Sequence, residues 1–335
     1  MVKTLGSNWA VRFLLILSLV IIGKLALTGS TSEAAPEQIV LKMGHVGSVE
    51  DVSHLTALKL AELTKEKTAG RVRIDIYPSS QLGGPRDMIE GLELGTVDIV
   101  LEPFARLSVY TPLASLPLVY YMIADREHAE KVWNGPIGKE LFSLVTQKCG
   151  ILVLTNMWRG TRNITSTKPI HKVEDLKGLK IRVPPFPISI DTWKTLGASP
   201  TPLEFNELFM ALKQGIVEAQ ENPISLSFTS GFPEVCKYWV MTNHLAEVNS
   251  FLMAGKKYDS FDKDTQKAIY EAGLVAAKFH GDFIDNMNSQ YIDKLKKQGN
   301  VIINPNVQGF RDKLKGFVNK YPDLQPWYEK IVAVK

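Results

Sequence analysis

The sequence predicts an α/β protein with two lobes and a long helix that joins them. Apolar strand-like segments alternate with helical segments in the first half of the chain, and this alternation returns in the second half. One helical stretch, residues 262–297, would span about 50 Å, which is longer than one small lobe is wide. The 335 residues are 45% hydrophobic and 22% charged, which suffices for two cores.

The first half of the chain has the order expected of a parallel sheet. Strands are predicted over residues 40–44, 72–77 and 97–101, and helices over residues 53–69 and 88–94. Glycines close both helices at the positions where the apolar periodicity ends.

The second half repeats this order. Three strands are predicted: one over residues 151–156, one that ends at Arg182, and one over residues 216–220. Helices are predicted over residues 188–196 and 205–214. The long helix is predicted to begin after a cap at Ser260 or Asp262 and to end near Gly299.

Arg182 is the first candidate functional residue. Leu179, Ile181 and Val183 alternate with it along a short strand that Pro184 ends. Ligands of open α/β sheets bind at the carboxyl ends of strands, and a guanidinium matches a carboxylate with two hydrogen bonds. The sequence therefore predicts a carboxylate clamp, with a surface arginine or an ion pair to Glu221 or another acid of the same lobe as the alternatives.

Residues 1–34 are predicted to be a signal peptide, with an uncleaved membrane anchor as the alternative. Lys3 and Arg12 precede an apolar run over residues 13–23, and small residues lead to a cleavage site after Ala34. The run is too short for a membrane span, which needs about 20 residues. Removal of this segment leaves a net charge of +2, which argues against nucleic acid as a partner.

Motifs of catalysis and metal binding are missing from the sequence. No phosphate loop, nucleophile elbow or dinucleotide fingerprint occurs, and the six histidines do not fall at ligand spacing. We therefore expect no catalytic residues, no metal and no cofactor. Cys149 and Cys236 are more simply interpreted as unpaired thiols than as a disulfide.

Four motifs resemble those of the substrate-binding proteins of tripartite ATP-independent periplasmic (TRAP) transporters, including the C4-dicarboxylate-binding-like family. They are YPSSQLG at residues 77–83, KPIHKVEDLKGLKIRVP at 168–184, GASPTP at 197–202 and VEAQENP at 217–223. The resemblance extends over nearly all of the predicted mature chain and occurs in family order.

This resemblance implies a type II clamshell in the periplasm that captures a small organic acid and delivers it to TRAP membrane permease subunits. Lobe I would comprise residues 36–159 and 248–287, and lobe II residues 160–247 and 288–335. The implied ligand-binding residues, by motif or position, are Arg182, Arg162, Asn222, Phe205, His45 and Arg106.

Some relatives that recognise sugar acids have a polar or acidic residue in place of Pro103, and smaller or polar residues in place of Pro185 and Phe186. These departures favour a more apolar pocket and a simpler carboxylate. Two other functions remain open. A secreted hydrolase or isomerase would use Glu102, Glu221 and His45 as acid and base groups, and a sensory receptor would use the same capture site.

Overall fold

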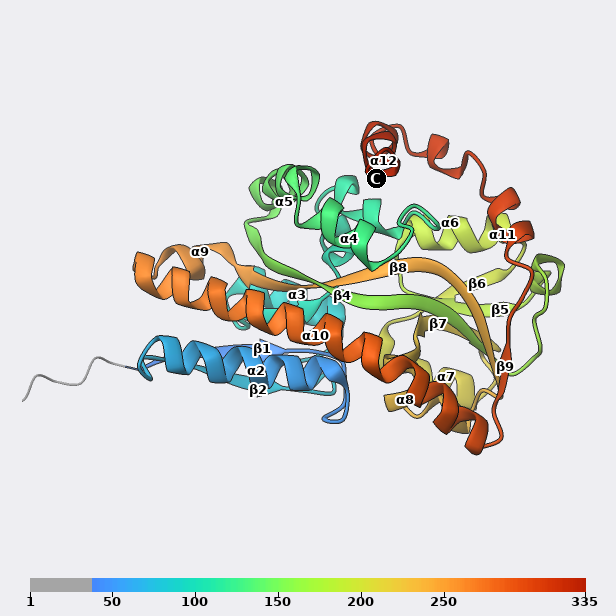
Figure 1. Cartoon of the computed structure of the whole chain (residues 1–335), viewed down its shortest axis with the longest axis horizontal. Helices are drawn as coiled ribbons and strands as arrows, with labels where there is room; N and C mark the ends of the chain where they lie inside the picture. Colours follow the sequence, from blue (N-terminus) through green and yellow to red (C-terminus); the bar gives the residue numbers. More distant parts are fainter. Residues whose placement is uncertain (1–37) are drawn as a thin grey trace, which may run out of the picture. The chain divides into compact units, whose positions relative to one another are not determined.

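The computed structural model describes residues 38–335, and within this range nine strands form one mixed sheet (Figure 1). The strand order is β2-β1-β3-β8-β4-β7-β5-β6, with β9 paired to β8. The strands are β1 (Ile39–Gly44), β2 (Val72–Tyr77), β3 (Ile99–Glu102), β4 (Ile151–Ser166), β5 (Lys180–Val183), β6 (Ser199–Pro202), β7 (Ala219–Pro223), β8 (Tyr238–Ala254) and β9 (Val301–Ile303). The predicted signal peptide lies outside the described residues.

Each end of the sheet is parallel. β1 pairs in parallel with β2 and β3, and β5 pairs in parallel with β6 and β7. Parallel neighbours need crossover segments, and helices provide them in both groups, so the predicted alternation is confirmed.

The two parallel groups are joined by the long antiparallel pair of β4 and β8. The sequence pattern predicted only residues 151–156 of β4 and did not predict β8. Both strands are buried along most of their length, so they lack the alternation that marks a half-exposed strand. The strand predicted over residues 216–220 is β7, which begins three residues later and pairs antiparallel with β4.

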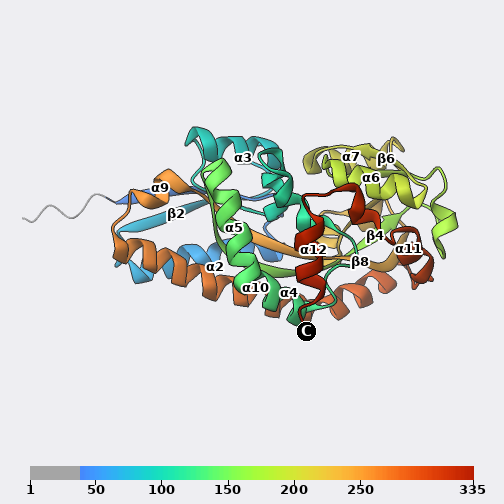
Figure 2. The same ribbon diagram turned by 90° about the horizontal axis from the view of Figure 1, so that it is seen from above.

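Helices cover the sheet (Figures 1 and 2). The α-helices are α2 (Val52–Lys67), α3 (Pro85–Leu94), α4 (Arg126–Trp133), α5 (Pro136–Cys149), α6 (Pro187–Leu196), α7 (Phe205–Lys213), α8 (Ile224–Thr229), α9 (Gly255–Asp259), α10 (Lys263–Lys297), α11 (Gln308–Lys313) and α12 (Gln325–Val332). The 3₁₀ helices are η1 (Phe104–Val109), η2 (Pro112–Leu118), η3 (Val173–Leu176), η4 (Phe232–Glu234) and η5 (Phe317–Lys320). Between residues 38 and 335, no helix combines the length and apolar character that a membrane span needs.

The long helix α10 packs against α2, which connects β1 to β2, and against α8, which follows β7, so it reaches both ends of the sheet as predicted. Asp262 is its N-cap, and its carboxylate accepts a hydrogen bond from the Thr265 N–H at 2.8 Å. The helix packs against α2 and also against α8 and β9, and Figure 1 shows it running beside α2. Tyr291 lies in its second half and packs against Phe228 of α8, with ring centroids 5.0 Å apart and the ring planes tilted by 41°.

Gly138, near the start of α5, is required by close packing. A Cβ at Gly138 would lie 2.1 Å from the main-chain oxygen of Trp133, so only glycine allows this close approach.

The two cysteines are free thiols, and Cys236 is buried.

Replacement of Ile269 by alanine tests the packing of α10. Ile269 is fully buried in the core formed by α2, α10 and strands β1–β3. We expect Ile269→Ala to lower the free energy of unfolding by about 2–5 kcal/mol, measured by urea denaturation. Lys267→Ala on the exposed face of the same helix should change it by less than about 0.5 kcal/mol, and equal losses would contradict the described orientation.

Candidate ligand-binding site

A small cavity of about 20 Å³ lies at the carboxyl ends of β3, β5 and β7. Its walls are Val46, Glu102, Pro103, Arg106, Arg159, Arg162, Arg182, Pro184, Phe186, Phe205, Asn222, Leu226 and Glu247. Five of the six predicted site residues therefore come together, although they are up to 116 positions apart in the chain (Arg106 to Asn222). The sixth, His45, is not part of the wall.

Arg182 is the next-to-last residue of β5 and is only 1% exposed. Its Nε donates to the main-chain oxygen of Leu203 at 2.9 Å, whereas its buried Nη2 has no hydrogen-bond partner. Among residues 38–335, no carboxylate forms an ion pair with Arg182, because Glu221 pairs with Arg162 instead. The alternative interpretation of Arg182 as half of an ion pair with Glu221 is therefore wrong.

The charge on Arg182 is held at a cost. Burial lowers the pKa of its guanidinium to about 9, and the nearby positive charges of Arg106 and Arg162 act in the same direction. The group is still charged at neutral pH. A buried charge without a counter-ion is unfavourable, so this site favours the arrival of an anion.

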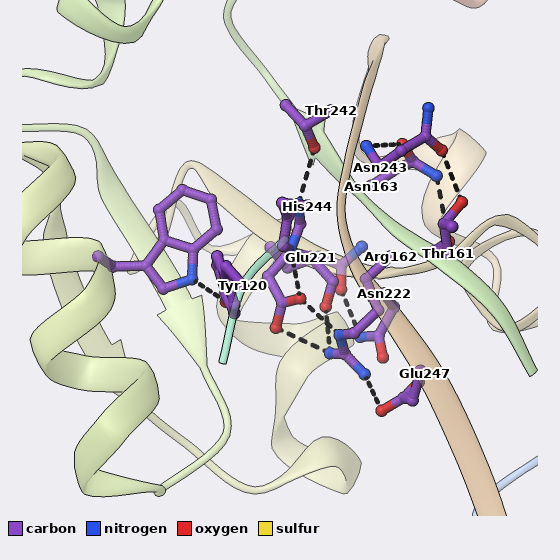
Figure 3. A network of polar contacts seen from close by, with 12 residues as sticks. Tyr120, Thr161, Arg162, Asn163, Glu221, Asn222, Thr242, Asn243, His244 and Glu247 are labelled. Carbon is purple, nitrogen blue, oxygen red and sulfur yellow. Dashed lines mark hydrogen bonds and ion pairs between the residues drawn. The ribbon is translucent and has the colours of Figure 1, made fainter. Parts of the chain in front are cut away.

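Arg162 lies on β4 and is already neutralised by two buried glutamates (Figure 3). Its Nε and Nη2 donate to the Glu221 carboxylate at 2.5 and 2.8 Å, and its Nη1 donates to Glu247 at 2.7 Å. Burial opposes the charge, but these two carboxylates outweigh it and raise the pKa of Arg162. The side chain reaches the cavity wall, yet most of its donors are engaged within the protein.

His244 extends this network away from the cavity (Figure 3). Burial lowers the pKa of His244, so the ring is neutral at pH 7. Its Nε2 lies 3.0 Å from the Glu221 carboxylate, which only accepts, so Nε2 carries the proton. Nδ1 then accepts from the Thr242 hydroxyl at 2.7 Å. The network fixes the position of Glu221 and, through it, Arg162.

Asn222, Phe205 and Arg106 form other parts of the wall. The Asn222 amide donates to the side-chain oxygen of Gln220 at 2.6 Å. Phe205 opens α7, and the Arg182 guanidinium lies 6.0 Å from its ring centre. Arg106 bonds Glu102 at 3.1 Å, and its guanidinium lies 5.1 Å from the Phe186 ring centre.

His45 follows β1, but its contacts lead elsewhere. Its Nε2 lies 3.2 Å from Nδ1 of His54 on α2. Burial lowers the pKa of His45 to about 4 despite the nearby Asp51, so the ring is neutral at pH 7. The implied role of His45 in the site has no geometric support from the cavity wall.

Two charged wall residues were not predicted: Arg159 and Glu247. Arg159 donates to Glu247 at 3.1 Å, and Glu247 also holds Arg162. Residues three apart in a regular strand point to opposite faces, but β4 has a register shift between Trp158 and Gly160. Gly160 has φ +87°, which glycine adopts readily. The bulge thus allows both arginines to line one cavity, and strict alternation could not have indicated it.

Charges also modify the predicted apolar character of the pocket. Pro103 and Phe186 line the cavity, as the sequence suggested, but Glu102 ends β3 in the same wall. Burial raises the pKa of Glu102, and Arg106 and Arg159 oppose this rise. The cavity is therefore a charged site with apolar walls, and the expectation of a mainly apolar pocket was incomplete.

A groove of about 510 Å³ adjoins the cavity, and Arg106 and Phe186 belong to both. Ile89 and Glu93 of α3 form one side of it, and residues 202–204 and Glu207 form the other. Figure 2 shows α3 and α7 on the two sides. Pro185 lines this groove rather than the cavity. Arg106 and Phe186 thus separate the groove from the cavity that Arg182 lines.

The fold and site define a solute-binding receptor of the two-lobed α/β class. The family model described as "Bacterial extracellular solute-binding protein, family 7" matches residues 43–323. The chain therefore belongs to this family, the DctP family of TRAP solute-binding proteins.

Relatives agree with this assignment. A solute-binding protein of Roseobacter denitrificans is 31% identical over 91% of this chain and 94% of its own length. The sialic acid-binding periplasmic protein SiaP of Vibrio cholerae is 31% identical over 92% of this chain and 97% of its own. The crystal structure of a TRAP periplasmic solute-binding protein from R. denitrificans with bound L-galactonate has a TM-score of 0.85 at 30% identity and covers 89% of this chain and 100% of that chain.

Glu221→Gln tests the buried network. Burial alone would raise the pKa of Glu221, but Arg162 and His244 lower it to about 2 from an ordinary value of 4.5. Between these values the unfolded state binds more protons, so the stabilising contribution is complete above about pH 4.5 and is lost toward pH 2. We expect Glu221→Gln to cost about 3–5 kcal/mol at pH 7.

This loss should shrink at pH 3, as measured by urea denaturation at both pH values. Glu218→Gln removes a glutamate from a more exposed pair with Lys168 and should cost less than about 1 kcal/mol at pH 7. A loss for Glu221→Gln that is the same at both pH values would contradict the ionised pair.

Arg182→Met tests whether the guanidinium is an unpaired buried charge. Methionine keeps an apolar stem and removes the charge, so the ligand-free protein should become more stable by about 1–4 kcal/mol. Urea denaturation of ligand-free protein measures this. A destabilised Arg182→Met variant would indicate that the guanidinium is already compensated within the fold.

Proposed function

We propose that this chain is the periplasmic receptor of a TRAP transport system, which captures a small organic acid and delivers it to membrane permease subunits. The observation that carries this proposal is Arg182, a buried guanidinium with an unpartnered Nη2 in the wall of a cavity. Family membership supplies the transport context. Bound L-galactonate and D-erythronate in related TRAP receptors are in line with a carboxylate ligand.

Arg182 would bind the ligand carboxylate through its free guanidinium edge. Charge-assisted hydrogen bonds are worth about 1.5–3 kcal/mol each, and a bidentate pair also fixes the orientation of the acid. Nε stays on the Leu203 oxygen at 2.9 Å and holds the guanidinium in place. Ligand arrival would therefore supply the counter-ion that the fold lacks.

Other wall residues would complete the site. Asn222 offers an amide without adding charge, and the Phe205 ring excludes water beside Arg182. Arg162 would act mainly by holding the wall in position, since its donors already reach Glu221 and Glu247. Arg106 would shield the cavity from the groove, because it also bonds Glu204 at 3.4 Å.

The proposed lobe boundaries fall on the central strand pair. Residues 159/160 and 247/248 are adjacent across the sheet, since Trp158 pairs with Val248 and Gly160 pairs with Glu247. The register shift at this point makes it a suitable place for bending. We infer that the lobes close about these strands while α10 spans both.

Binding is better supported than catalysis. The enzyme alternative needs Glu102, Glu221 and His45 as acid and base groups. Glu102 and Glu221 are committed to Arg106 and Arg162, and His45 is turned toward His54. A sensory receptor would use the same site, and recovery of an acid that is bound but chemically unchanged would favour either receptor over an enzyme.

Arg182→Lys is the direct test of the clamp. Lysine keeps the charge but cannot form the two-pronged contact, so we expect affinity for the acid that co-purifies with the native protein to fall about 100-fold or more. Mass spectrometry identifies that acid, and calorimetric titration measures its affinity.

Arg311→Lys is the matched control for this experiment. Arg311 lies over the Tyr121 ring at 4.2 Å, away from the cavity, so its replacement should leave the affinity unchanged. Unchanged affinity in Arg182→Lys would disprove the clamp.

A further inference from the structure

The buried charges around the cavity do not balance. In the described chain, four arginines and three glutamates form the cavity wall and its supporting network: Arg106, Arg159, Arg162 and Arg182, with Glu102, Glu221 and Glu247. Six of these side chains are at most 6% exposed, and Arg106 is 10% exposed. Their formal sum is one positive charge. Glu204 contacts Arg106 from the rim but is 22% exposed, so water screens it.

The excess charge resides on one residue. Glu221 pairs with Arg162, and Glu247 bridges Arg162 and Arg159. Glu102 pairs with Arg106. Arg182 alone among the four arginines has no carboxylate partner within the described residues.

The nearby histidines do not change this sum at neutral or slightly alkaline pH. Burial lowers the pKa of His244 and of His45, so both rings are neutral there. One ligand carboxylate on Arg182 therefore brings the buried site to neutrality.

A second ligand carboxylate would meet an unfavourable environment. Glu102 and Glu247 line the same cavity as Arg182, so further negative charge would face two carboxylates. Like charges repel strongly where water is excluded, and such contacts discriminate against the wrong ligand. Glu102 comes from β3 and Arg182 from β5, which belong to different parallel groups of the sheet.

We propose that the site selects acids with a single negative charge and rejects dicarboxylates, and that Glu102 is a main source of this rejection. This inference rests on the receptor function proposed above and specifies its ligand class. The acid is then a monocarboxylate whose uncharged body contacts the apolar wall, including Pro103, Phe186 and Phe205.

Calorimetric titration with matched acids tests this inference. Each pair has one chain length and differs in one end group: 3-hydroxypropanoate and malonate, 4-hydroxybutanoate and succinate, 5-hydroxypentanoate and glutarate. At pH 8, we expect the monocarboxylate to bind about tenfold or more tightly than its partner. Methyl esterification adds one methyl group to each free carboxyl group. We therefore expect the co-purifying acid to gain a single methyl group, as measured by mass spectrometry.

Two variants at Glu102 separate charge from shape. Glu102→Gln removes the negative charge and should narrow or invert the preference for monocarboxylates over dicarboxylates. Glu102→Asp keeps the charge and should retain this preference. Glu93→Gln removes an exposed glutamate of the outer groove, bonded to the Tyr110 hydroxyl, and should leave the preference unchanged. Circular dichroism confirms that each variant is folded.

The outcomes distinguish this inference from the function on which it rests. Equal or tighter binding of the dicarboxylates, or a preference unchanged in folded Glu102→Gln, overturns charge selection while leaving the receptor function intact. A wild-type protein that binds none of the six acids and carries no co-purifying acid contradicts the receptor function and the inference together.

Discussion

The unpaired guanidinium of Arg182 is the constraint on which the site depends. The fold buries this group at the end of β5 and gives it one main-chain acceptor but no carboxylate. The stability that the ligand-free protein loses in this way is recovered when an anion arrives. The fold therefore carries an uncompensated buried charge, which an anion would neutralise.

The neighbouring charges maintain this imbalance. Glu221 was the acid that the sequence offered as a partner for Arg182. Its carboxylate instead accepts hydrogen bonds from Arg162 and His244. Glu247 is similarly shared between Arg159 and Arg162. The network thus keeps the nearby carboxylates away from Arg182, which leaves its charge without a partner.

The sequence predicted the elements whose residues follow a regular apolar pattern or carry caps and prolines at their ends. The two parallel groups, α10 and the position of Arg182 at a strand end followed from apolar spacing, caps and prolines. The strand β8 did not, because continuous burial removes alternation. The sequence also did not predict that Arg162 is neutralised. Its two glutamate partners come from β7 and β8, which pair with β4 only in the folded sheet.

The bulge at Gly160 fixes the length of the segment R-G-T-R, residues 159–162. With the extra residue, both guanidiniums reach one cavity and share Glu247. Arg159 is the residue without a partner on β8, since Trp158 pairs with Val248 and Gly160 with Glu247, so deletion of this extra residue would restore regular pairing and remove one of the two guanidiniums. A change in the number of residues in this segment would therefore remove part of the receptor's charge pattern in a single step.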